Sequence, residues 1–290
     1  MLRDGGGGGG PWLERFGQFV ARREREAAAA DLCAYKTEVD QHDADAEPIG
    51  NAWSSRLFDG PLYASPSHDP DVPTTNLVFV QSRDGNTGAR NPTLLGGGDT
   101  DQHLIYEGLS RVAADAVLSG AETIRGGHFI FSTWLPELVA LRGSKGLPRH
   151  PFQIVATLRG IELEDALIFN VPELRVVLLT VPQCSAAMRH ALATRPWITP
   201  VVMSDARDLA GGFRQLRRLG VERISCIGGR TLARQLLDAR LIQDLYLTTA
   251  AKTGGEPNTP LYPTPLKGNL VVRKHGTGRD EGVTFEHFTL

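Results

Sequence analysis

The sequence predicts an α/β protein with a mostly parallel central sheet and helices on both faces. From residue 76 onward, apolar strand-like runs alternate with helix-like segments, and this alternation is typical of parallel sheets with crossover helices. Glycines follow several of the apolar runs, where parallel strands would end. The last two runs, at residues 270–274 and 283–288, are expected to close the sheet as an antiparallel pair.

Composition and charge exclude several classes of protein. The chain has 290 residues, of which 41% are hydrophobic, so it can bury a substantial core. Its net charge is -2, which gives no electrostatic footprint for nucleic acid or an anionic membrane. The 3 cysteines form no disulfide framework and no metal-binding pair, so we expect a cytoplasmic protein without a metal site. No apolar run approaches the ~20 residues of a membrane span.

Residues 1–75 are predicted to form an N-terminal extension of the main domain, which covers residues 76–290. Residues 5–10 are a flexible glycine tract. A helix is expected from residue 11 to about residue 39, with Trp12, Phe16 and Phe19 on one docking face. The density of Asp, Pro, Ser and Gly between residues 41 and 75 predicts a long irregular connection wrapped over the main domain.

The elements of the main domain follow from apolar periodicity. Strands are expected at residues 77–81, 116–119, 152–157, 175–180, 201–202 and 245–250. Helices are expected at residues 100–113, 185–193 and 208–219. Asp99 or Thr100 is expected to cap the first helix, and Thr231 the helix that follows the glycine pair.

The glycine pair Gly228 and Gly229 joins an apolar run to that last helix. Glycines at a strand-to-helix junction let the backbone approach a ligand, and the free N–H groups of the helix start attract an anion. This pattern fits a nucleotide diphosphate, although a plain tight turn is the alternative interpretation. Ser82 and Gly120 follow two other predicted strands, so the three strand ends are expected to meet at one edge of the sheet.

Four ordered motifs resemble the reductase domain of riboflavin biosynthesis, the dihydrofolate-reductase-like C-terminal half of the bacterial bifunctional deaminase-reductase. They are Ser-Arg-Asp-Gly at 82–85, Ala-Asp-Ala-Val-Leu-Ser-Gly-Ala-Glu-Thr-Ile-Arg at 114–125, Gly-Gly-Arg-Thr-Leu at 228–232, and Leu-Ile-Gln-Asp-Leu-Tyr-Leu-Thr-Thr-Ala-Ala at 241–251. The resemblance covers residues 76–290. No zinc deaminase motif is present in the sequence.

The resemblance implies a homodimeric reductase that uses NADPH to reduce a C=N bond in a pyrimidine or pterin-like substrate, nominally 5-amino-6-(5-phosphoribosylamino)uracil. Its cofactor-binding residues would be Ser82, Gly120, Ala121, Thr123, Thr180, Gly228, Gly229, Arg230, Thr231 and Leu232. Asp84 and Glu122 are the candidate proton donors, since a carboxylic acid with a raised pKa can supply the proton that accompanies hydride transfer. A turn-forming role is the alternative for Asp84.

The substrate side departs from the family pattern. Arg125 and His128 are the candidate substrate-binding residues, but residues 126–129 replace an acidic pair, and Leu104 and Ile105 replace the expected arginines. Such a pocket is expected to favour a dephosphorylated substrate, because a buried phosphate needs cationic partners. Two alternatives remain: a pterin, dihydrofolate-like or specialised-metabolite reductase with a changed pocket, and a catalytically silent nucleotide-binding scaffold.

Overall fold

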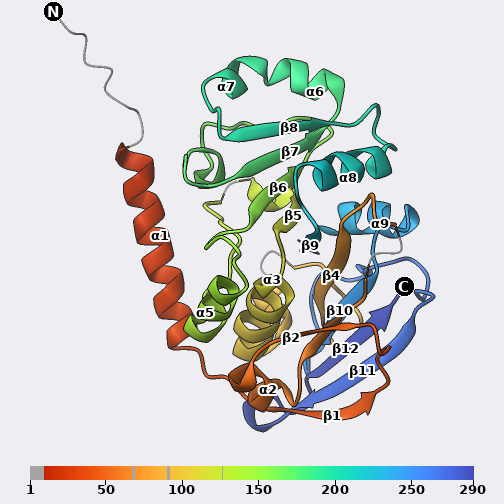
Figure 1. Cartoon of the computed structure of the whole chain (residues 1–290). Helices are drawn as coiled ribbons and strands as arrows, with labels where there is room; N and C mark the ends of the chain where they lie inside the picture. Colours follow the sequence, from red (N-terminus) through yellow and green to blue (C-terminus); the bar gives the residue numbers. More distant parts are fainter. Residues whose placement is uncertain (1–9, 67–68, 90–91, 126) are drawn as a thin grey trace, which may run out of the picture.

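One ten-stranded sheet runs through the computed structural model, which describes residues 10–66, 69–89, 92–125 and 127–290 (Figure 1). Its strand order is β1-β11-β12-β10-β4-β9-β5-β6-β7-β8. The parallel part contains β10 (Asp244–Thr249), β4 (Thr74–Gln81), β9 (Arg223–Cys226), β5 (Ala116–Gly120), β6 (Phe152–Ala156), β7 (Val176–Thr180) and β8 (Ile198–Val202). The antiparallel part contains β12 (Thr284–Thr289), β11 (Asn269–Gly276) and β1 (Tyr35–Asp40).

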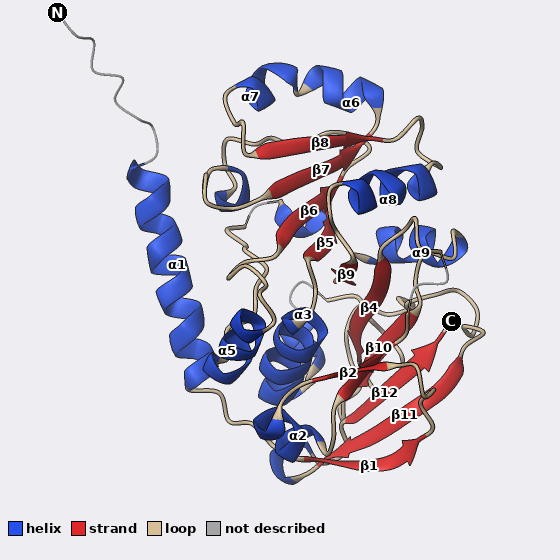
Figure 2. Ribbon diagram, in the orientation of Figure 1, coloured by secondary structure: helices blue, strands red, loops and turns tan. Residues whose placement is uncertain are grey.

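The predicted fold class is therefore confirmed, including the antiparallel pair near the C-terminus. Every residue of β7 is buried, as expected for a parallel strand covered on both faces. In Figure 2, α1 and α5 lie on the left of the view and α8 and α9 on the right, with β5 and β6 between them. Within the described residues, no helix is long and apolar enough to cross a membrane.

The helices and short elements complete the architecture. The helices are α1 (Gly10–Ala28), α2 (Ala52–Phe58), the π-helical η2 (Thr100–Leu109) with α3 (Ser110–Val112), α4 (Ala121–Ile124), α5 (Pro136–Ser144), α6 (Pro182–Ala187), α7 (Arg189–Ala193), α8 (Leu209–Arg218) and α9 (Arg230–Asp238). Short 3₁₀ turns are η1 (Pro92–Leu95), η3 (Leu167–Phe169) and η4 (Gly278–Asp280). A separate hairpin joins β2 (Glu47–Ile49) and β3 (Leu62–Ala64).

The N-terminal extension is more regular than predicted. The glycine tract lies outside the described residues except for Gly10, but the helix ends at Ala28 rather than near residue 39. Residues 35–40 instead form β1, whose side chains alternate between more buried and exposed positions and which pairs with β11. The predicted irregular connection contains β2, α2 and β3, and Asn51 caps α2 through a hydrogen bond from Ser54 N. The extension thus completes one edge of the main sheet.

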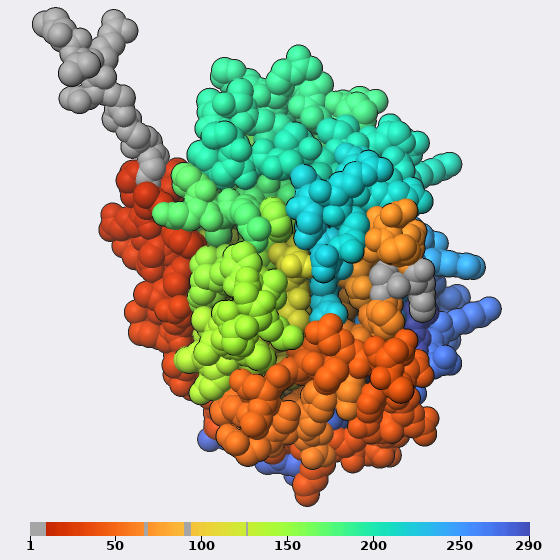
Figure 3. Space-filling view, viewed as in Figure 1, coloured from red at the N-terminus to blue at the C-terminus, as the bar shows by residue number. Residues whose placement is uncertain are grey.

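The helix α1 docks on the main domain through its predicted apolar face. Phe19 is buried, and its ring lies 5.9 Å from that of Trp134 in an edge-to-face contact. Arg23 forms an ion pair with the buried Glu107 of η2. Figure 3 shows the red N-terminal helix lying along the green segment of the main domain. Apolar packing and a shielded ion pair therefore fix α1 in place.

None of the three predicted capping side chains forms a capping hydrogen bond. Asp99 occupies the N-cap position of η2, but its backbone angles are helical and its carboxylate accepts a hydrogen bond from Asp31 N instead. Thr100 Oγ1 likewise accepts from Cys33 N. The N-cap of α9 is Gly229, so Thr231 lies within the first turn of that helix. The side chains of Asp99 and Thr100 instead bind backbone N–H groups of the N-terminal extension. The spacing of residues along the sequence does not reveal such contacts.

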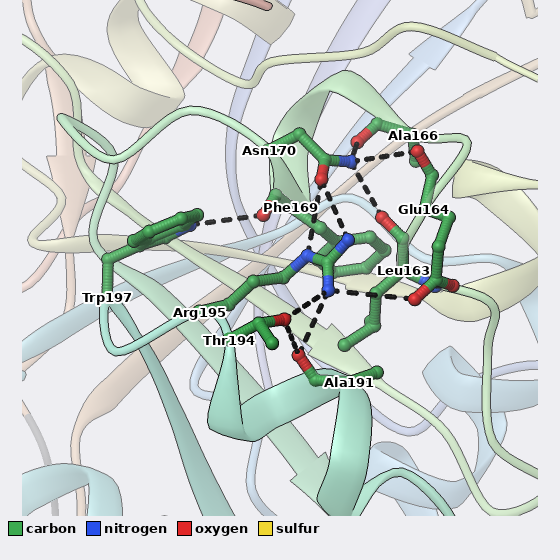
Figure 4. Close-up of polar contacts among 9 residues, drawn as sticks. All are labelled: Leu163, Glu164, Ala166, Phe169, Asn170, Ala191, Thr194, Arg195 and Trp197. Carbon is green, nitrogen blue, oxygen red and sulfur yellow. Dashed lines mark hydrogen bonds and ion pairs between the residues drawn. The ribbon is translucent and has the colours of Figure 1, made fainter. Parts of the chain in front are cut away.

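A polar network joins the connection between β6 and β7 to the segment before β8 (Figure 4). Asn170 Nδ2 donates to Leu163 O at 2.7 Å and to Ala166 O at 2.9 Å. Its Oδ1 accepts from Arg195 Nε at 3.2 Å and from Arg195 Nη2 at 3.0 Å. The Arg195 side chain is only 12% exposed. This paired contact fixes a long connection that otherwise has little regular structure.

Candidate active site

The turns after β5 and β9 are joined by backbone hydrogen bonds. Ile227 N donates to Leu118 O at 2.9 Å, and Gly120 N donates to Gly228 O at 2.8 Å. Gly228 has φ +84, and a Cβ there would lie 2.5 Å from Phe79 Cζ. Only glycine fits this position, because both the backbone angle and the space exclude a side chain. The Gly228–Gly229 peptide is cis.

The start of α9 is open beside this turn. Gly229 is exposed, and no heavy atom lies within 4 Å of a Cβ built on it. The backbone N–H groups in the first turn of a helix lack helical partners and carry partial positive charge. Thr231 is exposed, whereas Leu232 is buried and anchors the helix to the core. Arg230 Nη2 lies 3.7 Å from Glu256 Oε2, so its charge is partly neutralised.

The start of α4 forms a second turn at the same edge. Gly120 is its N-cap, and Ala121 and Thr123 lie in its single turn. Thr180 ends β7, two strands beyond β5, and its buried Oγ1 has no hydrogen-bond partner within the described part of the chain. At ~4.8 Å between strands, an extended ligand must span about 14 Å to reach from the β9 turn to Thr180.

Ser119 was not among the predicted site residues. It lies in β5, is fully buried, and its Oγ lacks a partner among the described residues. A hydroxyl inside a strand gives no distinctive sequence pattern, so only the three-dimensional structure reveals it. Ser119 and Thr180 are thus two unsatisfied hydroxyls near the carboxyl ends of β5 and β7, the two strands on either side of β6.

Ser82 and Asp84 belong to a network that joins two loops. Ser82 Oγ lies 2.7 Å from Asp84 Oδ1 and 2.9 Å from Gly254 O. Gly254 N and Asn86 Nδ2 also donate to the Asp84 carboxylate, at 3.0 Å and 2.9 Å. These hydrogen bonds, that of Ser82 first, lower the pKa of Asp84. An acid with a lowered pKa holds no proton to give near neutral pH, so the geometry favours the turn-forming alternative for Asp84.

Glu122 and Arg125 lie together on the rim of the site. The Glu122 side chain is 71% exposed, and its Oε1 lies 3.1 Å from Arg125 Nε and 3.6 Å from Arg159 Nη2. Arg125 Nη2 also donates to Gly160 O. Glu122 therefore lies in an ion-paired group exposed to solvent. Arg125 and Arg159 supply positive charge at this rim.

The remaining substrate-side residues do not form the predicted pocket. Leu104 and Ile105 are fully buried in the core, so they cannot provide an apolar wall for a ligand, and that prediction is wrong. His128 is exposed, and its ring lies 6.2 Å from that of Trp12 in α1. Gly126 lies outside the described residues. Gly127 lies close to the Phe129 ring, and a Cβ at this position would be 1.9 Å from Phe129 Cε2, so a side chain there would require movement.

Asp101 is an unusual acid that the sequence did not indicate. It lies on η2, is only 7% exposed, and burial raises its pKa to about 7. The nearby Asp280 carboxyl raises the pKa further, while a hydrogen bond with Thr248 opposes the shift.

No group of three or more potential ligand residues in the described parts of the chain is arranged to hold a metal ion.

Residues 73–277 match the family model of the RibD C-terminal domain. This chain belongs to that family. The resemblance drawn from the four motifs is therefore confirmed, and the family match begins close to the predicted domain boundary. No curated protein matches the chain.

Solved structures share the RibD C-terminal domain fold. A pyrimidine reductase-like protein from Corynebacterium diphtheriae is 18% identical, with a TM-score of 0.58 over 75% of this chain and 91% of that one. A riboflavin biosynthesis reductase from Saccharomyces cerevisiae is 15% identical, with a TM-score of 0.51 over 77% and 92%. The deaminase/reductase from Thermotoga maritima is 17% identical, with a TM-score of 0.54 over 75% of this chain and 56% of its own. These likenesses establish the fold.

Proposed function

We propose that this member of the RibD C-terminal domain family is an NADPH-dependent reductase that transfers hydride to a C=N bond of a pyrimidine substrate. The observation that carries the proposal is the pair of glycine turns at the ends of β5 and β9, joined by the 2.8 Å hydrogen bond from Gly120 N to Gly228 O. Together they bring the start of α4 next to the start of α9. Two helix starts at neighbouring strand ends suit a pyrophosphate.

The residues at this edge fit a dinucleotide. Backbone N–H groups at Gly229, Arg230 and Thr231 would bind one phosphate, and those at Ala121 and Thr123 the other. The unsatisfied Oγ1 of Thr180 is a hydrogen-bonding group for the adenosine portion. When bound, NADPH supplies the hydride. The protein's part is to orient the cofactor against the strand ends and to hold the substrate beside it.

The charge on the rim supports a phosphorylated substrate. Arg125 and Arg159 flank Glu122 at the end of β5, where they can form charge-assisted hydrogen bonds to a phosphate. The expected preference for a dephosphorylated substrate depends in part on an apolar wall formed by Leu104 and Ile105. Those side chains lie in the core instead. We therefore favour a substrate such as 5-amino-6-(5-phosphoribosylamino)uracil over its dephosphorylated analogue.

The cofactor part of the proposal is tested at Gly229. Gly229→Ala should bind NADPH about as well as the wild type, because Gly229 has open space around it and an ordinary φ of -52. Gly229→Asp should lose about 1,000-fold in affinity, since a carboxylate about 4 Å from a phosphate costs about 4 kcal/mol at an intermediate dielectric. Fluorescence titration with NADPH, with circular dichroism as the folding control, measures both variants. Equal affinities in the two variants would contradict the cofactor site.

The substrate part is tested by following NADPH oxidation with the phosphorylated pyrimidine and with its dephosphorylated analogue. We expect faster turnover of the phosphorylated compound and loss of that preference in Arg125→Ala, because the arginine would contact the phosphate. Preference for the dephosphorylated compound would restore the changed-pocket alternative. Binding of NADPH without oxidation by either compound would favour the silent scaffold.

A further inference from the structure

A polar cavity of about 280 Å³ lies at the opposite end of β10 from the proposed cofactor site. Its floor comes from Gln243, just before β10, and from β11 and β12, and its walls come from the segments before β2 and after β3. Asp244, the first residue of β10, pairs with Asn76, whereas Ser82 follows the other end of β4. With ~3.3 Å per residue along the strand, about 16 Å separates the two ends.

A buried histidine with an unsatisfied nitrogen forms part of this cavity. His287 is only 1% exposed, and its Nε2 lies 2.7 Å from Asp244 Oδ1. Ser65 N donates to Asp244 Oδ2 at 2.9 Å, and Ser65 Oγ donates to Oδ1 at 2.7 Å. Since this carboxylate is the acceptor, Nε2 carries a proton, and Nδ1 is the ring nitrogen left for a ligand. Nδ1 has no partner within the described residues.

The other lining groups add acceptors and negative charge. Asp43 and Asp45 line the cavity and are exposed, and Asn269 and Thr289, which also line it, each carry a side-chain oxygen. None of the described residues that line it is Lys or Arg. The two histidines that line it, His42 and His287, each lie against a carboxylate, that of Asp40 or Asp244. A phosphate or a carboxylate would therefore meet negative charge with no Lys or Arg among the described lining residues to offset it. A ligand with N–H donors and positive charge would meet complementary groups.

We propose that this cavity binds a small organic cation, an alkylammonium with N–H donors. One ammonium group fits beside His287 Nδ1 and the Asn269 and Thr289 oxygens, and the Asp43 and Asp45 carboxylates attract the charge. The site is separate from the reductase site, so its occupant is neither the cofactor nor the pyrimidine. The inference does not depend on the proposed function.

Isothermal titration calorimetry of the full chain with 1,4-diaminobutane tests this inference. The matched probe is 1,4-butanediol, which has a similar length and hydrogen-bonding groups but no charge. We expect saturable binding of the diamine only. The double variant Asp43→Asn with Asp45→Asn should weaken it about tenfold, because both acids are exposed and each contributes a modest charge pair. His287→Gln should also weaken it, because this change removes the unpartnered Nδ1.

A matched charge control uses Glu173→Gln with Glu281→Gln, two exposed acids that do not line the cavity. This control should bind the diamine like the wild type, and the Asp43/Asp45 variant should still bind NADPH if the reductase proposal holds. Circular dichroism checks folding independently of either ligand. The inference is overturned by an absence of saturable heat up to about 10 mM diamine. Equal binding of the diol, or undiminished binding in the Asp43/Asp45 variant, would also overturn it.

Discussion

Replacing Asp101 by Asn should stabilise the protein at alkaline pH. Burial raises the pKa of Asp101 from 3.8 to about 7, so the folded state keeps a proton that the unfolded state has released. The free energy of unfolding is therefore unaffected by this group below about pH 4 and falls as the pH rises toward 7. One pKa unit corresponds to about 1.4 kcal/mol, so the full loss is about 4 kcal/mol. Asparagine has the same shape and no charge to lose.

Urea denaturation at pH 4.5, 6.5 and 8 would measure this effect. The difference between Asp101→Asn and wild type should be about 1 kcal/mol at pH 4.5, which already lies above the unfolded pKa of 3.8, and grow to about 4 kcal/mol at pH 8. Asp84→Asn is the control, because hydrogen bonds lower the pKa of Asp84 and its neutralisation should give no gain at pH 8. The reasoning is refuted if the two pH profiles are parallel, or if Asp101→Asn is the less stable protein at pH 8.

Three further predictions concern the structural parts of the fold. Arg195→Ala should lower the free energy of unfolding by about 2 kcal/mol, since it removes a charged donor from Asn170; an unchanged urea midpoint would contradict this. Burial lowers the pKa of His150 from 6.5 to about 4, so this group should cost stability as the pH falls through that interval, by up to about 3 kcal/mol. His150→Phe should lose less stability there, and equal losses would argue against the assignment. Deleting residues 1–10 should leave thermal stability unchanged, whereas deleting residues 1–75 should cause aggregation. If the protein without residues 1–75 is soluble and equally stable, the extension is a separate tether.

Local patterns predicted most of the parallel sheet. The apolar runs at β4, β5, β6, β7 and β10 were located to within a few residues, because strands buried on both faces are rich in aliphatic residues. Strand β1 was missed, since its alternating sequence follows an alanine-rich helix and only pairing with β11 defines it. The tertiary partner, rather than local propensity, makes this segment a strand.

The same distinction applies to the candidate active site. The glycine turns at Gly120 and Gly228 were predictable, because a strand, a glycine and a helix start lie next to one another in the chain. The environment of Asp101 was not, because Thr248 and Asp280 come from distant strands and loops. Leu104 replaces an arginine expected from the family resemblance, which predicts that it faces the substrate pocket, and only the packing of η2 reveals that it is in the core.

The pairing of β1 with β11 has a consequence for synthesis of the protein. The two strands lie about 230 residues apart, so at 5–20 residues per second the ribosome needs about 10–50 s to make the second after the first. During that interval β1 has no partner in the sheet. Its outward-facing Lys36, Glu38 and Asp40 are exposed in the finished fold, and charged residues of this kind discourage pairing with other chains. The charged side chains of β1 that lie at the edge of the folded sheet therefore also oppose aggregation of this strand in the nascent chain, before β11 is made.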